Sequence, residues 1–202
     1  MAAAEEPSAD ISAAEFRSAM GHFATGVTVV TSIGEDGEPV GTTASAVSSL
    51  SLRPPLVLVC FDLESLTLRA LRAHGAFVVN VLAAPQQHLS ANFARRGLTA
   101  AWDDVQHRPG PTGSPRLDGA LAVLECTVEN SLPGGDHEIV IGRVHDVEVS
   151  YGDVAPLLYW RGSYLPLGLA ASAGSAEPGR GADRQQAEDG ERYSGRVASL
   201  RG

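Results

Sequence analysis

Hydrophobic residues of this chain gather in short runs rich in valine, isoleucine and leucine, with turn residues between them. Val27–Ile33 is the first run, and after the turn Gly34–Gly37 the segment Glu38–Ala44 returns as its partner strand. Leu56–Phe61 is apolar without interruption, which predicts a strand buried on both faces. Ala76–Leu82 is predicted as a further strand. Later strands are expected at Leu121–Ser131, Glu138–Tyr151 and Leu157–Trp160.

Three segments have the spacing of short helices. Ser12–Phe23 opens with the capping-box pattern S-A-A-E, and Gly26 stops the helix. Ser65–His74 places apolar residues on one side and has Gly75 directly after its last turn, a common helix terminator. Pro85–Ala94 is predicted as the third helix. All three are short, so strands are expected to dominate the fold.

The order of these elements favours an antiparallel barrel. Arg95–Arg116 contains several glycines and prolines and predicts a long irregular connection, which in a compact domain is usually functional or mobile. Strands and helices do not alternate, so the pattern predicts a mostly β protein, a closed or partly closed antiparallel barrel flanked by short helices. No G-x-G-x-x-G motif follows a strand, which argues against a Rossmann nucleotide site.

The two ends of the chain differ from its middle. Residues 1–11 are predicted to be a flexible leader, and residues 12–169 to be the folded domain. From Ala170 to Gly202 large apolar residues are almost absent, so this segment buries too little surface to offset the entropy of ordering. We therefore predict a disordered tail at 170–202.

Composition narrows the classes of function. The net charge of −9 argues against a nucleic-acid surface, which needs a basic face. No apolar run reaches the length of about 18 residues that a membrane helix needs, and the N-terminus lacks the basic and apolar regions of a signal peptide. Cys60 and Cys126 lie in apolar runs, which predicts buried free thiols in a reducing compartment, the cytoplasm. Histidine and cysteine spacing predicts no metal site.

The segment Val40–Cys60 carries the most unusual chemistry. It combines six hydroxyl side chains with a single charge, that of Arg53. Hydroxyls and free backbone N–H groups suit a wall that holds a polar anionic ligand. The alternative is a strand-loop-strand unit in which the hydroxyls only satisfy local backbone groups. The six residues are Thr42, Thr43, Ser45, Ser48, Ser49 and Ser51.

Polar residues within or beside other elements are further candidates. Ser65 and Thr67 open a predicted helix, whose N-terminus is either an anion site or simply capped by Ser65. Asn80 is polar within an apolar strand, and a buried amide needs partners from a ligand or from the fold. His137 ends the connection Leu132–His137 between two long strands, where it either meets a ligand or is a surface histidine in a turn.

Aromatic and cationic residues form the last group of candidates. Phe93 either flanks a ring system or packs in the core. Tyr159, Trp160, Arg161 and Tyr164 cluster near the end of the predicted domain. Arg161 suits a phosphate and the aromatic rings suit stacking on an adenine. The alternative is that these residues close the barrel or form a dimer interface.

Six motifs in a fixed order resemble the flavin reductase family with the FMN-binding split-barrel fold, the small reductase partners of two-component flavin monooxygenases. Each motif alone is a modest signal, but six in the family's order are a strong one, and they span about Phe16 to Leu167. The motifs are F-A-T-G-V-T-V-V-T-S (23–32), G-T-T-A-S-A-V-S-S-L-S-L-R-P-P-L-V-L-V (41–59), F-V-V-N-V-L (77–82), L-S-A-N-F-A (89–94), G-D-H-E-I-V-I-G-R-V (135–144) and P-L-L-Y-W-R-G-S-Y (156–164).

The resemblance implies a fold, an FMN-binding split β-barrel of antiparallel, Greek-key-like topology, and a site. It places backbone amides near Thr43–Ala46 along the isoalloxazine and ribityl chain, with the later serines toward the phosphate. It places the G-D-H motif on the nicotinamide side of the flavin, which makes His137 the candidate catalytic residue. With the candidates argued from residue type alone, the predicted flavin-binding residues are Thr42, Thr43, Ala44, Ser45, Ser48, Ser49, Ser51, Ser65, Thr67, Asn80, Phe93, Arg161 and Tyr164.

The activity that the resemblance implies is that of an NAD(P)H:flavin oxidoreductase. Hydride would pass from NADH or NADPH to FMN or FAD, and the loosely held flavin would leave, reduced, for a partner monooxygenase component. NADH is favoured, and Arg95 and Arg96 are the candidate site for the 2′-phosphate of NADPH. The resemblance also implies a homodimer with the flavin at its interface. The residues leave the choice between FMN and FAD open.

Two other functions are compatible with the same barrel. One is a non-catalytic flavin carrier or sensor, but the Gly135–His137 motif favours the reductase, because a pure flavin binder needs no nicotinamide side. The other is an oxidase of the pyridoxamine-phosphate type. That reaction needs a basic cluster for the substrate phosphate, and the predicted domain has few basic residues.

Overall fold

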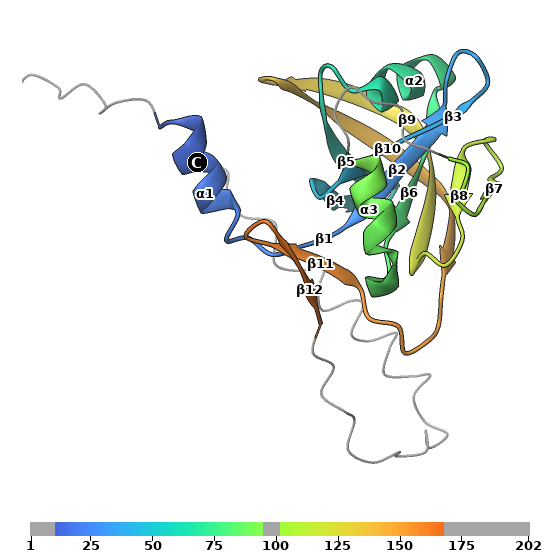
Figure 1. The fold of residues 1–202 in the computed structure, drawn as a ribbon. Helices are drawn as coiled ribbons and strands as arrows, with labels where there is room; N and C mark the ends of the chain where they lie inside the picture. The colour runs from blue at the N-terminus through green and yellow to red at the C-terminus, as the bar shows by residue number, and fades with distance from the viewer. Residues whose placement is uncertain (1–10, 95–101, 168–202) are drawn as a thin grey trace, which may run out of the picture. The chain divides into compact units, whose positions relative to one another are not determined.

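The computed structural model describes residues 11–94 and 102–167, and its main feature is one antiparallel sheet of seven strands (Figure 1). The strands lie in the order β3-β2-β6-β9-β10-β5-β4. They are β2 (Thr28–Ile33), β3 (Pro39–Ala44), β4 (Val47–Leu52), β5 (Pro55–Asp62), β6 (Ala76–Val81), β9 (Ala122–Gly134) and β10 (His137–Val149). The mostly β, antiparallel fold predicted from the sequence is confirmed.

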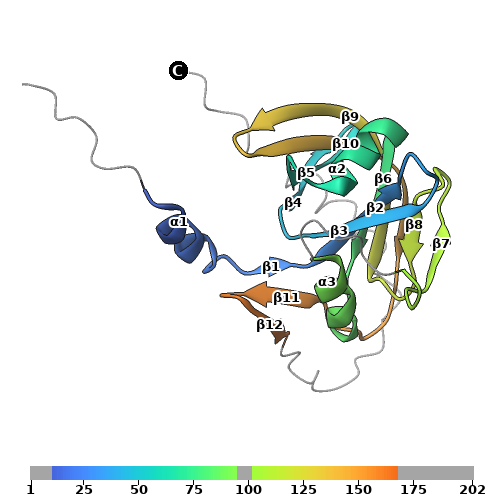
Figure 2. The same ribbon diagram turned by 45° about the horizontal axis from the view of Figure 1, so that its top comes forward.

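Two small sheets and three α-helices complete the described chain. The first small sheet joins β1 (Thr25–Gly26), β11 (Leu157–Trp160) and β12 (Ser163–Pro166), and the second is the hairpin of β7 (His107–Pro109) and β8 (Pro115–Leu117). The helices are α1 (Ala13–Met20), α2 (Leu66–His74) and α3 (Gln87–Phe93), with a short 3-10 turn, η1, at Ala84–Gln86. Both α2 and α3 pack on β2 and β3 (Figures 1 and 2).

Helix α1 begins as predicted but ends earlier. Ser12 and Glu15 form the expected capping box, in which the Glu15 amide donates to the Ser12 hydroxyl over 3.2 Å and the Ser12 amide donates to the Glu15 carboxylate over 3.0 Å. The helix ends at Met20 rather than near Phe23, because Gly21 caps it. Residues 1–10 of the predicted leader at 1–11, the predicted tail at 170–202, and Arg95 and Arg96 lie outside the described residues.

Four strands lie where the sequence predicted irregular chain. β4 occupies the end of the hydroxyl-rich segment, where pairing with β5 compensates for its weak hydrophobic pattern. β7 and β8 form a hairpin inside the predicted connection 95–116. β12 extends past the last predicted strand and pairs with β11. In each case a neighbouring strand supplies the backbone hydrogen bonds, and this pairing cannot be predicted from the local sequence.

The connection expected at Leu132–His137 is instead the tip of a long hairpin. Pairing of β9 with β10 continues to the opposed residues Gly134 and His137, so that only Gly135 and Asp136 form the turn. Gly135 has φ +74°, a left-handed conformation that glycine adopts without strain. His137 is therefore the first residue of a strand rather than part of a loop.

The main core lies between α2 and the sheet. Leu68 and Leu71 of α2 are fully buried against strand residues that include Phe77 and Val140. The sheet approaches Phe77 so closely that a β-carbon at Gly142 would lie 2.4 Å from the ring. Only glycine fits at this position of β10, so the packing fixes the strand that carries His137.

Candidate functional site

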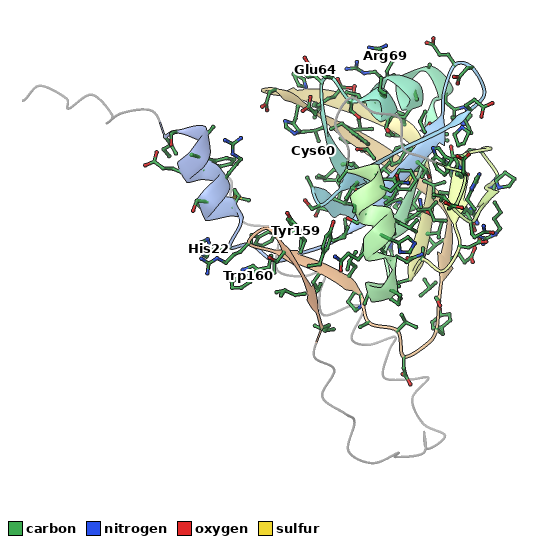
Figure 3. All side chains as sticks on the ribbon, viewed as in Figure 1. His22, Cys60, Glu64, Arg69, Tyr159 and Trp160 are labelled. Atoms are coloured by element: carbon green, nitrogen blue, oxygen red, sulfur yellow. The ribbon has the colours of Figure 1, made fainter. Side chains whose placement is uncertain are left out.

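A cavity of about 470 Å³ opens between the edge of β3, the end of β5, the N-terminus of α2, the start of β10 and the β11–β12 hairpin. Its volume is in the range of small-molecule sites. Figure 3 labels three lining residues, Cys60 on β5, Glu64 just before α2 and Tyr159 on β11. The sequence-predicted site residues that line it are Thr42, Thr43, Ala44, Ser45, Ser65, Thr67, His137 and Tyr164.

The first wall is β3, the terminal strand of the seven-stranded sheet, whose outer backbone edge faces no further strand of that sheet. The Thr43 hydroxyl donates to the carbonyl of Ser90 over 2.7 Å, which ties β3 to α3. Thr42 and Ser45 also line the cavity, and their hydroxyls have no hydrogen-bond partner among residues 11–94 and 102–167. This wall therefore offers hydroxyls and backbone groups to a polar ligand.

The second wall is the first turn of α2. The Ser65 hydroxyl caps the helix by accepting from the Leu68 amide over 3.3 Å, and Thr67 is 2 % exposed yet reaches the cavity. The free amides and dipole of a helix N-terminus attract anions. Asp62 and Glu64 also line this side, and the Glu64 amide donates to the Asp62 carboxylate over 3.0 Å.

His137 forms the third part of the site. It begins β10 opposite Asp62 of β5, and its Nδ1 lies 2.7 Å from the Asp136 carboxylate. A carboxylate can only accept, so Nδ1 carries the proton of this hydrogen bond. The imidazole is thereby oriented from its Nδ1 side, which leaves Nε2 for a ligand in the cavity.

Two tyrosines from the β11–β12 hairpin close the site. Tyr159 and Tyr164 stack edge to face with ring centroids 5.2 Å apart. The Tyr164 hydroxyl lies 2.8 Å from the Ser90 hydroxyl, which connects the hairpin to α3. Tyr159 is 39 % exposed and offers a large ring surface at the mouth of the cavity. The aromatic cluster predicted from the sequence thus contributes its two tyrosines.

The later serines of the hydroxyl-rich segment lie on β4, outside the set of cavity-lining residues. Ser48 donates to the carbonyl of Ser49 over 3.2 Å, and Ser51 accepts from the Arg53 amide over 3.2 Å. Arg161 is also outside the lining and stacks its guanidinium over Trp160, 5.3 Å from the ring centroid. Their predicted contacts with flavin phosphate therefore stay predictions.

Asn80 and Phe93 lie behind the cavity rather than in it. The Asn80 amide is fully buried, donates to the Val29 carbonyl over 3.0 Å and accepts from the Leu117 amide over 2.8 Å. Phe93 is 2 % exposed, and a β-carbon at Gly41 of β3 would come within 2.8 Å of its ring. Both residues support the strands that form the site through the fold itself.

Several lining residues were not predicted. Asp62 and Glu64 precede the helix cap, and their charge next to an apolar strand was a usable signal. Ser90 lies on the buried side of α3, where a polar residue beside apolar Leu89 gives a weaker signal. Cys60 was predicted to be buried, but it is partly exposed and lines the cavity, because β5 turns this face toward the opening.

Burial separates the second thiol from this site. Burial, with a further contribution from Glu125, raises the pKa of the Cys126 thiol to about 12.

Within the described ranges no three His, Cys, Asp or Glu side chains gather as metal ligands do. None of the described helices is long and apolar enough to cross a membrane.

Comparison with known proteins places this geometry in a family. The family described as "Flavin reductase like domain" matches residues 20–168. The reductase subunit HsaB of a flavin-dependent monooxygenase from Mycobacterium tuberculosis is 41 % identical over 158 residues, covering 78 % of this chain and 83 % of the relative. A flavin reductase (NADH) from Kitasatospora aureofaciens is 45 % identical over 151 residues, covering 74 % and 78 %.

Solved structures agree with these sequence matches. The NADH:FAD oxidoreductase SgcE6 of Streptomyces globisporus, in complex with NAD and FAD fragments, superposes with a TM-score of 0.72 at 35 % identity over 78 % of this chain and 94 % of its own. Component B of nitrilotriacetate monooxygenase from Mycobacterium thermoresistibile gives 0.72 at 40 % identity, covering 80 % and 89 %.

Proposed function

Because the chain belongs to the flavin reductase-like domain family, we propose that it transfers hydride from a reduced nicotinamide to FMN or FAD and supplies the reduced flavin to a monooxygenase component. The predicted split-barrel fold is confirmed by the likeness to flavin reductase structures. The observation that carries the proposal is the cavity, in which a hydroxyl-bearing strand edge, a helix N-terminus and an oriented histidine meet. The carrier or sensor alternative gives no role to that histidine.

The residues present fit a flavin. Thr42, Ser45 and the edge of β3 would hydrogen-bond the polar rim of the ring, and Ser65 with Thr67 would hold the phosphate at the N-terminus of α2. Bound flavin would supply the acceptor for the hydride, so the protein needs to bind, orient and exclude water rather than to provide a nucleophile. Tyr159 lines the cavity and is itself 39 % exposed, in keeping with a flavin that enters and leaves as a substrate.

His137 is the residue that we propose for the nicotinamide. With Nδ1 bonded to Asp136, Nε2 accepts a hydrogen bond from a donor such as the nicotinamide carboxamide. The side chains flanking it include the carboxylates of Asp62 and Asp136, and none of the described lining residues is a lysine or arginine. This lining offers no cation to a 2′-phosphate, and one relative is a flavin reductase (NADH), which together support NADH as the donor.

A kinetic experiment tests the function. NADH oxidation by the purified protein is measured with and without added FMN or FAD, for the natural chain, for His137→Ala and for His88→Ala, an exposed histidine outside the cavity. We expect turnover only when free flavin is added, at least about a tenfold lower kcat/KM for NADH in His137→Ala, and no change in His88→Ala. Flavin binding without oxidation of NADH or NADPH would establish the carrier or sensor instead.

We also propose a homodimer whose partner subunit covers part of the flavin site. Large apolar side chains are exposed on α1, just after it and on β4, which is costly for an isolated chain. Phe16 and Phe23 are 59 % and 69 % exposed, and Leu52 is 84 % exposed. Sedimentation equilibrium should give a dimer that Phe23→Asp with Leu52→Asp dissociates. A monomer at all accessible concentrations of the natural chain would contradict this proposal.

We place the enzyme in the cytoplasm. Its cysteines Cys60 and Cys126 are free thiols, which suits a reducing compartment where NADH is available. Fractionation of the source cells with an antibody against the chain tests this placement, and recovery outside the cytoplasmic fraction would overturn it.

A further inference from the structure

A second cavity of about 400 Å³ lies between the β2–β3 turn and the outer side of α2. It shares three lining residues, Gly41, Leu66 and Thr67, with the proposed flavin cavity. Thr67 belongs to the α2 turn at which we place the flavin phosphate. The two cavities are therefore neighbours at the phosphate end of the proposed flavin site, not at its nicotinamide end.

The second cavity has one cationic lining residue, Arg69. This side chain is exposed on α2 (Figure 3) and makes no hydrogen bond or ion pair within residues 11–94 and 102–167. By contrast, Arg72, one turn further along the same helix, is paired with Glu138. An arginine that faces a cavity without a protein partner is well suited to bind a phosphate through its planar guanidinium.

The opposite side of the second cavity is the β2–β3 turn, which carries Glu35, Asp36 and Glu38. Asp36 holds the turn by accepting from the Glu38 amide over 3.1 Å. The carboxylates of Glu35 and Glu38 are exposed and are acceptors for ribose hydroxyls. Val40 and Leu66 add apolar surface of the kind that contacts a nucleobase. The cavity thus offers a different set of residues to each part of a nucleotide: its phosphate, its ribose and its base.

We propose that this second cavity binds the adenosine monophosphate half of FAD, with Arg69 on its phosphate, and that the enzyme therefore prefers FAD over FMN. The inference rests on the proposed function, because it assumes that the flavin phosphate lies at Ser65 and Thr67. A dinucleotide that continues from that phosphate reaches Arg69 on the next turn of the same helix. NADH contains the same adenosine monophosphate half, but it approaches from the His137 end of the first cavity.

Equilibrium binding of oxidised FAD and FMN, followed by quenching of flavin fluorescence, tests the inference. The natural chain should bind FAD more tightly than FMN. Arg69→Met should raise the Kd for FAD about tenfold, the effect of losing one charge-assisted hydrogen bond, with the Kd for FMN and the KM for NADH within about twofold. Arg69→Lys should recover part of the loss. Arg72→Met, which removes the same charge from the same helix outside the cavity, is the matched control.

Three results would overturn the inference while leaving the proposed function intact. The first is an unchanged Kd for FAD in Arg69→Met. The second is an equal rise for FMN and FAD, which would assign Arg69 to the flavin phosphate itself. The third is a raised KM for NADH with unchanged FAD binding, which would assign the second cavity to the nicotinamide nucleotide. Failure of the natural chain to bind either flavin would instead contradict the proposed function.

Discussion

Two regions of this barrel are rich in polar side chains, and they use them in opposite ways. Beneath the β7–β8 hairpin, polar groups are buried and bonded to one another, around Glu125 and Arg116. Around the proposed flavin cavity, the side chains of Thr42, Ser45 and the neighbouring Arg69 line cavities and have no hydrogen-bond or ion-pair partner among residues 11–94 and 102–167. Buried polar groups need hydrogen-bond partners within the fold, whereas polar groups that line a cavity can bond to a ligand instead.

The polar groups under the β7–β8 hairpin are bonded to one another. Glu125 is 1 % exposed and accepts from Arg116 Nε and from the Thr112 amide, both over 2.8 Å. Arg116 also donates to Asp146 over 2.6 Å. Burial alone would lower the pKa of Arg116, but the hydrogen bonds to Asp146 and Glu125 outweigh it and raise that pKa. This region therefore stabilises the hairpin and contributes no residue to the lining of the proposed flavin cavity.

The largest expected effect comes from opening this network. Arg116→Met leaves the buried Glu125 carboxylate without its cation and should lower the free energy of unfolding by about 3–5 kcal/mol. Urea denaturation measures the loss. The double variant Arg116→Met with Glu125→Leu removes both charges and should recover much of it. A single variant as stable as the natural chain would show that the ion pair contributes nothing.

A smaller loss of stability is expected at Asn80. Asn80→Ala leaves the buried Leu117 amide without an acceptor, which should lower the free energy of unfolding by about 1–3 kcal/mol. Flavin affinity should stay within about twofold, because Asn80 bonds only to the fold and does not line the cavity. Fluorescence titration alongside urea denaturation checks both. A loss of flavin affinity without a loss of stability would contradict this expectation and show that Asn80 acts in the proposed flavin cavity.

Ser65 has a structural role and a proposed binding role, since it caps α2 and also lines the cavity. Ser65→Ala should lower the free energy of unfolding by about 1 kcal/mol and raise the Kd for FMN about tenfold through the lost phosphate contact. Ser150→Ala, an exposed serine outside the cavity lining, is the control and should change neither. If both variants bind FMN like the natural chain, the phosphate does not lie at α2.

The smallest effect concerns acid stability. The hydrogen bond from Arg72 lowers the pKa of Glu138 below the ordinary value of 4.5. Its stabilisation is therefore complete above that value and is lost as pH falls through the lower folded-state pKa. Because Arg72 is half exposed, the contribution should stay below about 1 kcal/mol. Arg72→Met should lose less stability than the natural chain on acidification, and equal losses would contradict the pairing.

Local sequence predicted much of the fold and part of the site. Runs such as Val27–Ile33 and Leu56–Phe61 identify their strands because burial on a sheet needs apolar residues in short runs. β4 was missed because its serines hide the pattern and its partner β5 supplies the pairing. The extension of β10 to His137 was missed because Pro133 and the glycines near the tip resemble a loop.

Residue type alone pointed to Thr42, Ser65 and His137, and all three line the cavity, while their roles in binding and catalysis stay predictions. The site was not predictable where the outcome depends on a distant partner. Asn80 resembles a ligand contact in sequence, yet its acceptor oxygen meets the Leu117 amide on another strand. In the sequence, Arg69 resembles an ordinary surface residue of a helix. It lines a cavity only because the β2–β3 turn lies opposite it in the fold.

A crystal structure with oxidised FAD tests the central claim most directly. We expect the flavin ring in the first cavity against Thr42–Ser45 and its phosphate at Ser65 and Thr67, with the His137 ring facing the exposed side of the flavin. Flavin density at any other surface, with the first cavity empty, would contradict the site proposed for this reductase.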